Sequence, residues 1–184
     1  MILPVTVYGD TLLRKKAVEI DKDYKDLNIL IENMYETMYN ADGIGLAAPQ
    51  VGLSIRMFIV DGTGMEEEEP EMKDFKKVFI NPEINETKGE KWEMEEGCLS
   101  LPGIRENVSR QDEVSITYYD EHWNKITETY KGFAGRVVQH EYDHLEGKLF
   151  IDYISPLRRK LLKGRLTAIT KGKSKAHYRV NVPG

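Results

Sequence analysis

The chain has 184 residues, 40% of them hydrophobic and 31% charged, and a formal net charge of −5. This composition is typical of a folded globular protein and excludes a disordered one. No apolar run approaches the roughly 18 residues of a membrane span, and the first ten residues lack a signal-peptide pattern. Because Cys98 is the only cysteine, an internal disulfide is excluded. We therefore expect one cytoplasmic domain over residues 1–184.

Charge is distributed unevenly along the chain. The segment from about residue 153 onward carries nine of the 26 Lys and Arg residues and none of the 31 Asp and Glu residues. A basic segment on an acidic body favours an anionic partner for that segment, although a solvated helix face would have the same composition. The acidic run Glu66–Glu69 falls within residues 62–74, which we expect to form a solvated loop.

Apolar residues in the first third of the chain predict one helix. It begins after Asp23 and Asp26, which could cap it, and ends near Asn40. The residues that recur at helical spacing are Leu27, Leu30, Ile31, Met34 and Met38. A Gly- and Ala-rich segment follows at residues 43–50. Short β-branched and aromatic runs then predict four strands, at Met57–Val60, Val78–Ile80, Val114–Tyr119 and Ile126–Tyr130.

The last third of the chain predicts two more helices. One runs from about Phe133 to Glu146, with Gly147 just past its C-terminal cap. Pro156 begins a short basic helix, and residues 177–182 resemble a strand. Strands on both sides of one strong helix, without regular crossovers, indicate an α+β fold instead of a doubly wound α/β fold.

The strongest indication of chemical function lies on the helix predicted from about Phe133 to Glu146. Residues 140–144 read His-Glu-Tyr-Asp-His, an H-E-x-x-H motif. Its i, i+4 spacing places His140 and His144 one turn apart on one face, where both imidazoles can reach one metal ion. Glu141 lies at the edge of this face, as a general base requires. Phe133 and Val137 share the same face and could line a substrate pocket.

The motif leaves the third metal ligand open, and a catalytic site usually has three protein ligands. The position that metzincins fill with a third His is Phe150, and no Glu follows Glu146. Cys98 is favoured because its Gly-Cys-Leu-Ser-Leu-Pro segment could present a thiolate from a sharp turn, and a metal would deprotonate it. The remaining candidates are Asp152, His122 and His177.

Three segments together resemble the signature motifs of the peptide deformylase family. They are Gly-Ile-Gly-Leu-Ala-Ala-Pro-Gln at residues 43–50, Glu-Gly-Cys-Leu-Ser at 96–100 and Gln-His-Glu-Tyr-Asp-His at 139–144. The resemblance implies an α+β fold with antiparallel β-sheets around a central helix that carries H-E-x-x-H. It also implies removal of the formyl group from N-formylmethionine at the start of nascent bacterial polypeptides.

The same resemblance implies a role for each matching residue. Cys98, His140 and His144 would bind the metal, which is Fe²⁺ in the family, with Zn²⁺, Ni²⁺ or Co²⁺ also accepted. Glu141 would take the proton from the attacking water and pass it to the leaving amine. The implied oxyanion donors are the Gln50 side chain and the Leu99 backbone N–H. Gly45 would bind the substrate peptide through its backbone. Ile44, Phe133 and Val137 would form an apolar pocket for the methionine side chain, and Arg136 would lie at the rim of this pocket.

The resemblance further implies that the enzyme meets its substrate at the ribosome, where the basic C-terminal segment would bind RNA. The basic residues concerned are Arg158, Arg159, Lys160, Lys163, Arg165, Lys171, Lys173, Lys175 and Arg179. Neither DNA nor a membrane is an expected partner.

Three other functions fit parts of the sequence. Residues 43–48 match the G-x-G-x-x-A pattern of dinucleotide enzymes, but Pro49 would interrupt the helix that must follow, and the next strand begins too soon for a crossover. An H-E-x-x-H endopeptidase would need a third His or Glu ligand. A structural metal site would need a fourth protein ligand, and none is apparent.

Overall fold

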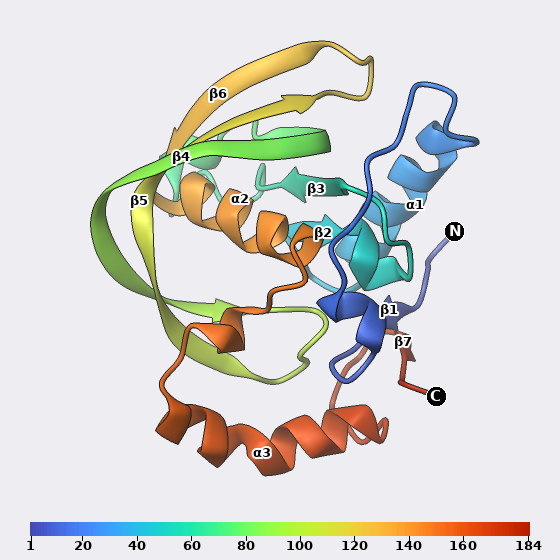
Figure 1. The fold of residues 1–184 in the computed structure, drawn as a ribbon, viewed down its shortest axis with the longest axis vertical. Helices are drawn as coiled ribbons and strands as arrows, with labels where there is room; N and C mark the ends of the chain where they lie inside the picture. Colours follow the sequence, from blue (N-terminus) through green and yellow to red (C-terminus); the bar gives the residue numbers. More distant parts are fainter.

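The computed structural model describes residues 1–184, and its centre is the helix α2 (Gly132–Leu145). A five-stranded antiparallel sheet with the order β2-β3-β4-β5-β6 curves around this helix (Figure 1). The strands of this sheet are β2 (Gly45–Ala47), β3 (Met57–Asp61), β4 (Lys76–Gly97), β5 (Arg105–Tyr119) and β6 (Lys125–Lys131). The predicted α+β class with an antiparallel sheet around the H-E-x-x-H helix is confirmed.

The first predicted helix is α1 (Leu27–Asn40), which buries the apolar face that its spacing predicts. Its cap differs from the prediction. Asp26 precedes the helix in the left-handed conformation, with φ 58°, and its side chain makes no capping hydrogen bond. Asp23 lies farther upstream, where its own N–H donates to the side chain of Asp21. The helix is therefore held by packing of its apolar face more than by a side-chain cap.

The predicted segments Val78–Ile80 and Val114–Tyr119 are parts of much longer strands, β4 and β5, which form a curved hairpin (Figure 1). The outer half of β4 was missed because it is rich in Glu, Lys and Asn, which have low strand propensity. Register shifts follow Ile80, next to Pro82, and Lys88. Such bulges bend a strand, which suits the curvature that wraps this hairpin around α2.

The core consists of three apolar clusters, the first of which contains the buried apolar residues of α2. The first packs α2 against the sheet, and the second packs α1 against β2 and β3. The third lies beneath α3 (Pro156–Thr170), through Leu162, Leu166 and Ile169. This basic helix is 15 residues long, longer than the short helix predicted, and Ser155 caps it by accepting from the N–H of Arg158. The basic segment is therefore packed on the rest of the chain.

The C-terminal tail returns to the N-terminus. Only two residues of the predicted strand-like tail form a strand, β7 (Val180–Asn181), and this pairs with β1 (Val5–Thr6). This small second sheet is parallel, unlike the main one. Both chain ends therefore lie on the same side of the molecule (Figure 1). None of the helices has the length and apolar character needed to cross a membrane.

Residues 62–74 are not simply a solvated loop. Met72 is fully buried beside the first cluster, within a short 3-10 helix at Pro70–Met72. The Glu71 carboxylate accepts a hydrogen bond of 3.0 Å from the N–H of Phe133, and the Asp112 carboxylate accepts one of 3.2 Å from Gly132. Two free N–H groups at the start of α2 are thus satisfied by side chains from elsewhere in the chain.

We predict that Glu71→Ala destabilises the protein, because the N–H of Phe133 loses its acceptor. Loss of a side-chain acceptor at a helix N-terminus typically costs about 0.5–2 kcal/mol. Urea unfolding followed by circular dichroism measures this change in the free energy of unfolding. Glu67→Ala is the matched control, since Glu67 is exposed and carries the same charge without a hydrogen bond. Equal stability of the two variants would contradict the capping role.

Candidate metal centre and active site

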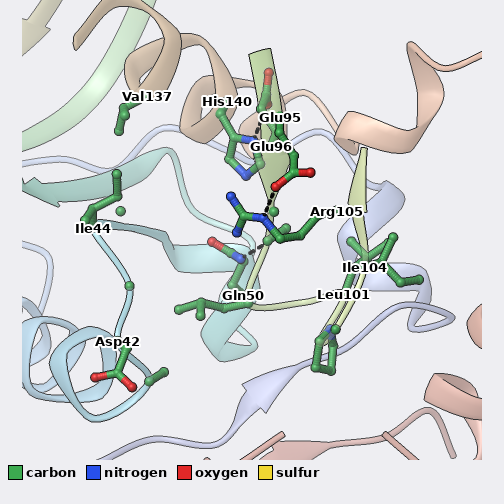
Figure 2. Close-up of a pocket in the computed structure, with 18 of the residues that line it drawn as sticks. Asp42, Ile44, Gln50, Glu95, Glu96, Leu101, Ile104, Arg105, Val137 and His140 are labelled. Atoms are coloured by element: carbon green, nitrogen blue, oxygen red, sulfur yellow. Dashed lines mark hydrogen bonds and ion pairs between the residues drawn. The ribbon is translucent and has the colours of Figure 1, made fainter. Parts of the chain in front are cut away.

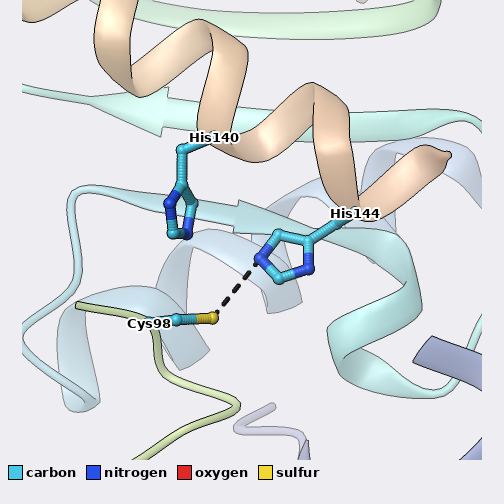
Figure 3. A group of neighbouring side chains, drawn as sticks. All are labelled: Cys98, His140 and His144. Atoms are coloured by element: carbon cyan, nitrogen blue, oxygen red, sulfur yellow. Dashed lines mark hydrogen bonds between the residues drawn. The ribbon is translucent and has the colours of Figure 1, made fainter. Parts of the chain in front are cut away.

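Cys98, His140 and His144 come together at one point beside α2. Their ligand atoms all lie within 4.8 Å of one another. The two histidines project from successive turns of α2 towards Cys98, which lies in the turn just after β4 (Figure 3). Cys98 Sγ is 3.4 Å from His144 Nε2. The sequence left the third ligand open, and the fold places Cys98 beside the two histidines.

The other three candidates for the third ligand are engaged elsewhere. His122 lies in the turn between β5 and β6, where its N–H donates to Asp120. The carboxylate of Asp152 pairs with Arg14 at 2.6 Å. His177 lies at the pocket rim, 3.1 Å from the exposed carboxylate of Asp42. None of these three belongs to the cluster of possible metal ligands.

A buried carboxylate orients His140. Glu96 accepts from His140 Nδ1 at 2.7 Å, which leaves the opposite nitrogen, Nε2, to face the cluster. Arg110 donates to both oxygens of the Glu96 carboxylate, and Arg136 donates to one of them at 2.7 Å. Burial alone would raise the pKa of Glu96, but the hydrogen bonds and charges of His140 and Arg110 hold it well below its usual range.

This ion-pair network was not found from the sequence. Arg136, expected near the rim of the pocket, is 3% exposed and also stacks on the ring of Trp92, 4.3 Å from its centroid. Arg110 bridges Glu96 to Asp143 at 2.8 Å. Arg110 lies two residues after Val108 and Glu96 two residues after Met94, so both fall in phase with apolar positions of their strands. This periodicity is the only signal in the sequence, and it does not show which residues pair.

The loop that carries Cys98 is held on several sides. Gln50 is fully buried at the end of the 3-10 helix Ala48–Val51. Its amide lies 3.4 Å from Cys98 Sγ and donates to the Ser100 hydroxyl at 3.2 Å. The Gln50 carbonyl in turn accepts from the N–H of Ala47. The segment after β2 is therefore a short turn beside the cluster, not the long helix of a dinucleotide site.

Glu141 lies next to the cluster with one oxygen free. It is 5% exposed, and its Oε2 atom has no hydrogen-bond partner in the protein. Burial raises the pKa of Glu141 to about 7, a range in which a carboxyl can both take up and release a proton. Gly45 lies against this carboxylate, since a Cβ on Gly45 would be only 2.4 Å from Glu141 Oε1. Position 45 must be glycine as long as Glu141 occupies this place.

A pocket of about 570 Å³ opens in front of these residues (Figure 2). Ile44 and Val137 lie on the left side of the view, and Gln50 and His140 lie near its centre (Figure 2). His144 is 1% exposed and lies behind the pocket instead of lining it. The sequence-predicted residues that line it are Ile44, Gly45, Gln50, Cys98, Leu99, Phe133, Val137, His140 and Glu141.

Further lining residues escaped the sequence interpretation. Met65 and Met94 add apolar surface, and Glu95 and Arg105 form an ion pair of 2.7 Å at the exposed rim. The C-terminal tail supplies one wall, through residues 175–178. These positions lie outside the three motifs, so no local pattern pointed to them.

The cluster suits one divalent ion. A tetrahedral ion with bonds of about 2.0–2.3 Å holds neighbouring ligands roughly 3.5 Å apart, and Cys98 Sγ and His144 Nε2 have this spacing. One thiolate and two imidazoles form a donor set that favours borderline transition metals over Mg²⁺ or Ca²⁺. Burial lowers the pKa of His144 well below its usual value, which keeps this imidazole neutral and able to coordinate.

Known proteins share both the sequence and the fold of this chain. A family model described as polypeptide deformylase matches residues 2–160. The peptide deformylase of Christiangramia forsetii is 53% identical over 190 residues, covering 100% of this chain and 97% of that protein. That of Cytophaga hutchinsonii is 46% identical over 183 residues, covering 100% of this chain and 98% of that protein.

Solved structures agree with these relatives. The crystal structure of a peptide deformylase from Legionella pneumophila superposes with a TM-score of 0.82 at 36% identity, covering 95% of this chain and 99% of that one. The enzyme from Thermotoga maritima gives 0.75 at 43% identity, covering 85% and 99%. This chain therefore belongs to the peptide deformylase family, the metal-dependent hydrolases that remove the formyl group from N-terminal formylmethionine.

Proposed function

We propose that Glu141 moves the proton in the deformylation reaction of this chain, beside a divalent ion held by Cys98, His140 and His144. One observation carries the assignment. The unpartnered Oε2 of Glu141 is buried at the same pocket as the Cys-His-His cluster. A buried carboxylate oxygen without an internal donor can accept a proton from a reacting water.

The pocket supports recognition of an N-formylmethionyl peptide. Phe133 and Val137 are almost fully buried, and with Ile44 they form an apolar wall suited to a methionine side chain. β2 is an edge strand. The Ile44 carbonyl accepts from Asp61 of β3, so the alternation of an antiparallel ladder turns the polar backbone groups of Gly45 away from β3. These groups can bind an extended peptide as an added strand.

The reaction needs donors for the oxygen that becomes negatively charged. The Gln50 side-chain amide points towards Cys98, and the N–H of Leu99 makes no hydrogen bond inside the protein. Both can donate to the formyl oxygen as charge develops on it. A bound divalent ion supplies Lewis-acid chemistry, which polarises a carbonyl and acidifies water. Glu141 then gives this proton to the leaving amine, and formate is released.

The metal that we propose for the native protein is Fe²⁺, with Zn²⁺, Ni²⁺ or Co²⁺ as working substitutes. The thiolate and two imidazoles that support this choice are compatible with all four ions. We also propose a cytoplasmic enzyme that meets nascent chains at the ribosome. The basic helix α3 supports that partner, because Lys160 and Lys163 on it are exposed and form no ion pair within the chain.

We predict that Glu141→Gln retains the metal but loses most of its turnover, because the ligands remain and the proton acceptor is gone. General acid–base groups typically contribute about 10²–10⁴-fold. Formate release from an N-formyl-Met tripeptide measures the effect, with the N-acetyl peptide and an internal amide bond as alternative substrates. Glu93→Gln, an exposed carboxylate of β4 outside the pocket, is the control. Turnover of Glu141→Gln within a few-fold of the control would exclude Glu141 as the base.

Removal of a ligand should release the metal. Changing a residue that only hydrogen-bonds to a metal ligand often weakens metal binding by about 10–100-fold. We expect Cys98→Ala and His144→Ala, which remove a ligand itself, to weaken it by at least this much. His122→Ala, which removes an imidazole from a distant turn, should keep the wild-type content. Anaerobic purification followed by metal analysis checks these contents and identifies the native ion. A full complement of metal in Cys98→Ala would remove Cys98 from the ligand set.

The ribosome proposal predicts salt-sensitive binding through α3. Pelleting with ribosomes over a salt series measures how the logarithm of the binding constant falls with the logarithm of the salt concentration. This slope should be shallower when Arg159, Lys160 and Lys163 are changed to Ala, by roughly 0.7–0.9 for each phosphate that is no longer neutralised. The control carries Lys22→Ala, Lys25→Ala and Lys73→Ala, three exposed lysines on other surfaces. Identical slopes for the two triple variants would show that α3 is not the binding surface.

A further inference from the structure

The C-terminal tail reaches the pocket although it lies beyond residue 160, where the match to the family model ends. Pairing of β7 with β1 anchors the tail, with Val180 opposite Val5. Residues 175–178, just before β7, line the pocket. His177 Nε2 lies 3.1 Å from a carboxylate oxygen of Asp42, in the segment that leads into β2. The tail is therefore held by the pairing of β7 with β1 and contacts the pocket lining at Asp42.

Tyr178 connects this tail to the loop that carries Cys98. Its hydroxyl donates a hydrogen bond of 2.7 Å to the carbonyl oxygen of Leu99. No other group in the protein donates to this carbonyl. Ser100, the next residue, is held independently, since its carbonyl accepts from the N–H of Tyr8 at 2.8 Å and its hydroxyl accepts from Gln50. Tyr178 thus supplies the only hydrogen bond that fixes the Leu99 carbonyl.

The orientation of Leu99 matters because its free N–H is a proposed donor to the reacting oxygen. The Leu99 N–H and the Leu99 carbonyl belong to adjacent peptide planes that share the Leu99 Cα. Loss of the Tyr178 hydrogen bond would free the plane of the Leu99 carbonyl, and this would loosen the neighbouring plane of the N–H, which is held only where the Cys98 carbonyl accepts from the N–H of Leu101. A donor contributes to catalysis only when it is held at the position where charge develops. Such a change reduces stabilisation of the transition state more than it reduces binding of the substrate in the ground state.

We propose that Tyr178 is a positioning residue of the active site, and that the C-terminal tail holds the Leu99 N–H in place through it. This inference rests on the proposed function, in which Leu99 is an oxyanion donor. Tyr178 itself does not touch the reacting atoms. Its role is to fix, from a segment outside the three motifs, the loop between the metal ligand Cys98 and the anchored Ser100.

Tyr178→Phe is the direct test, because it removes only the hydroxyl and keeps the ring. We expect kcat on an N-formyl-Met tripeptide to fall about two- to tenfold, the rate equivalent of one hydrogen bond, with KM changed by less than about twofold. Metal content should equal that of the wild type. Gln50→Ala, which removes a proposed direct donor, serves as the reference and should lower kcat further.

The matched control is Tyr35→Phe. The Tyr35 hydroxyl also donates to a backbone carbonyl, that of Lys77, at 3.1 Å. Tyr35 lies on α1 and does not line the pocket. This variant should lose comparable stability without a change in kcat. A second readout needs no turnover. The N–H of Leu101, which donates to the Cys98 carbonyl inside the loop, should exchange with deuterium faster in Tyr178→Phe than in Tyr35→Phe.

The outcomes separate the inference from the function on which it rests. Wild-type protein that releases no formate would overturn the proposed function. An active wild type with equal kcat in Tyr178→Phe and Tyr35→Phe would overturn the positioning role, as would unchanged exchange of the Leu101 N–H. A lower kcat with unaltered metal content and faster exchange supports it.

Discussion

The Glu96 carboxylate is the group on which the geometry of this site depends. It is buried where β4 ends, and it receives hydrogen bonds from His140 on α2, from Arg110 on β5 and from Arg136 on α2. One carboxylate therefore joins the long hairpin to the central helix and orients a metal ligand. A buried charge of this kind is stable only when its hydrogen bonds are complete, and breaking such a set typically costs about 3–5 kcal/mol.

A second constraint is the close approach of β2 to α2. The Glu141 carboxylate occupies the space where a side chain at position 45 would lie, so the edge strand and this carboxylate lie in close contact. Ile44, which immediately precedes β2, and Val137 of α2 line the same cavity. The close approach that demands a glycine thus also sets the distance between the strand edge that we propose for peptide binding and the carboxylate that we propose as the proton acceptor.

The outer parts of the molecule reinforce this centre from a distance. Glu71 and Asp112, from the acidic loop and from β5, satisfy the first N–H groups of α2. The tail contributes Tyr178 to the loop after β4. Charge also divides by location, because the basic residues of α3 lie on the surface and outside the pocket lining, whereas Arg110 and Arg136 are buried against Glu96. The buried arginines hold the carboxylate that orients a metal ligand, and the exposed basic residues form the surface that we propose for ribosome binding.

The sequence by itself determined the local features, because these depend on spacing within one element. Helical period gave the face shared by His140, His144, Phe133 and Val137, and the three motifs together indicated the family. Tertiary structure decided what depends on distant segments. Spacing alone left Cys98 as the favoured of four candidate ligands, the resemblance to the family implied it, and the hairpin brings it to α2. The hydrogen bond of Arg136 to Glu96, the capping by Glu71 and the hydrogen bond of Tyr178 to Leu99 join residues 40 to 79 positions apart, and a one-dimensional pattern contains no record of such contacts.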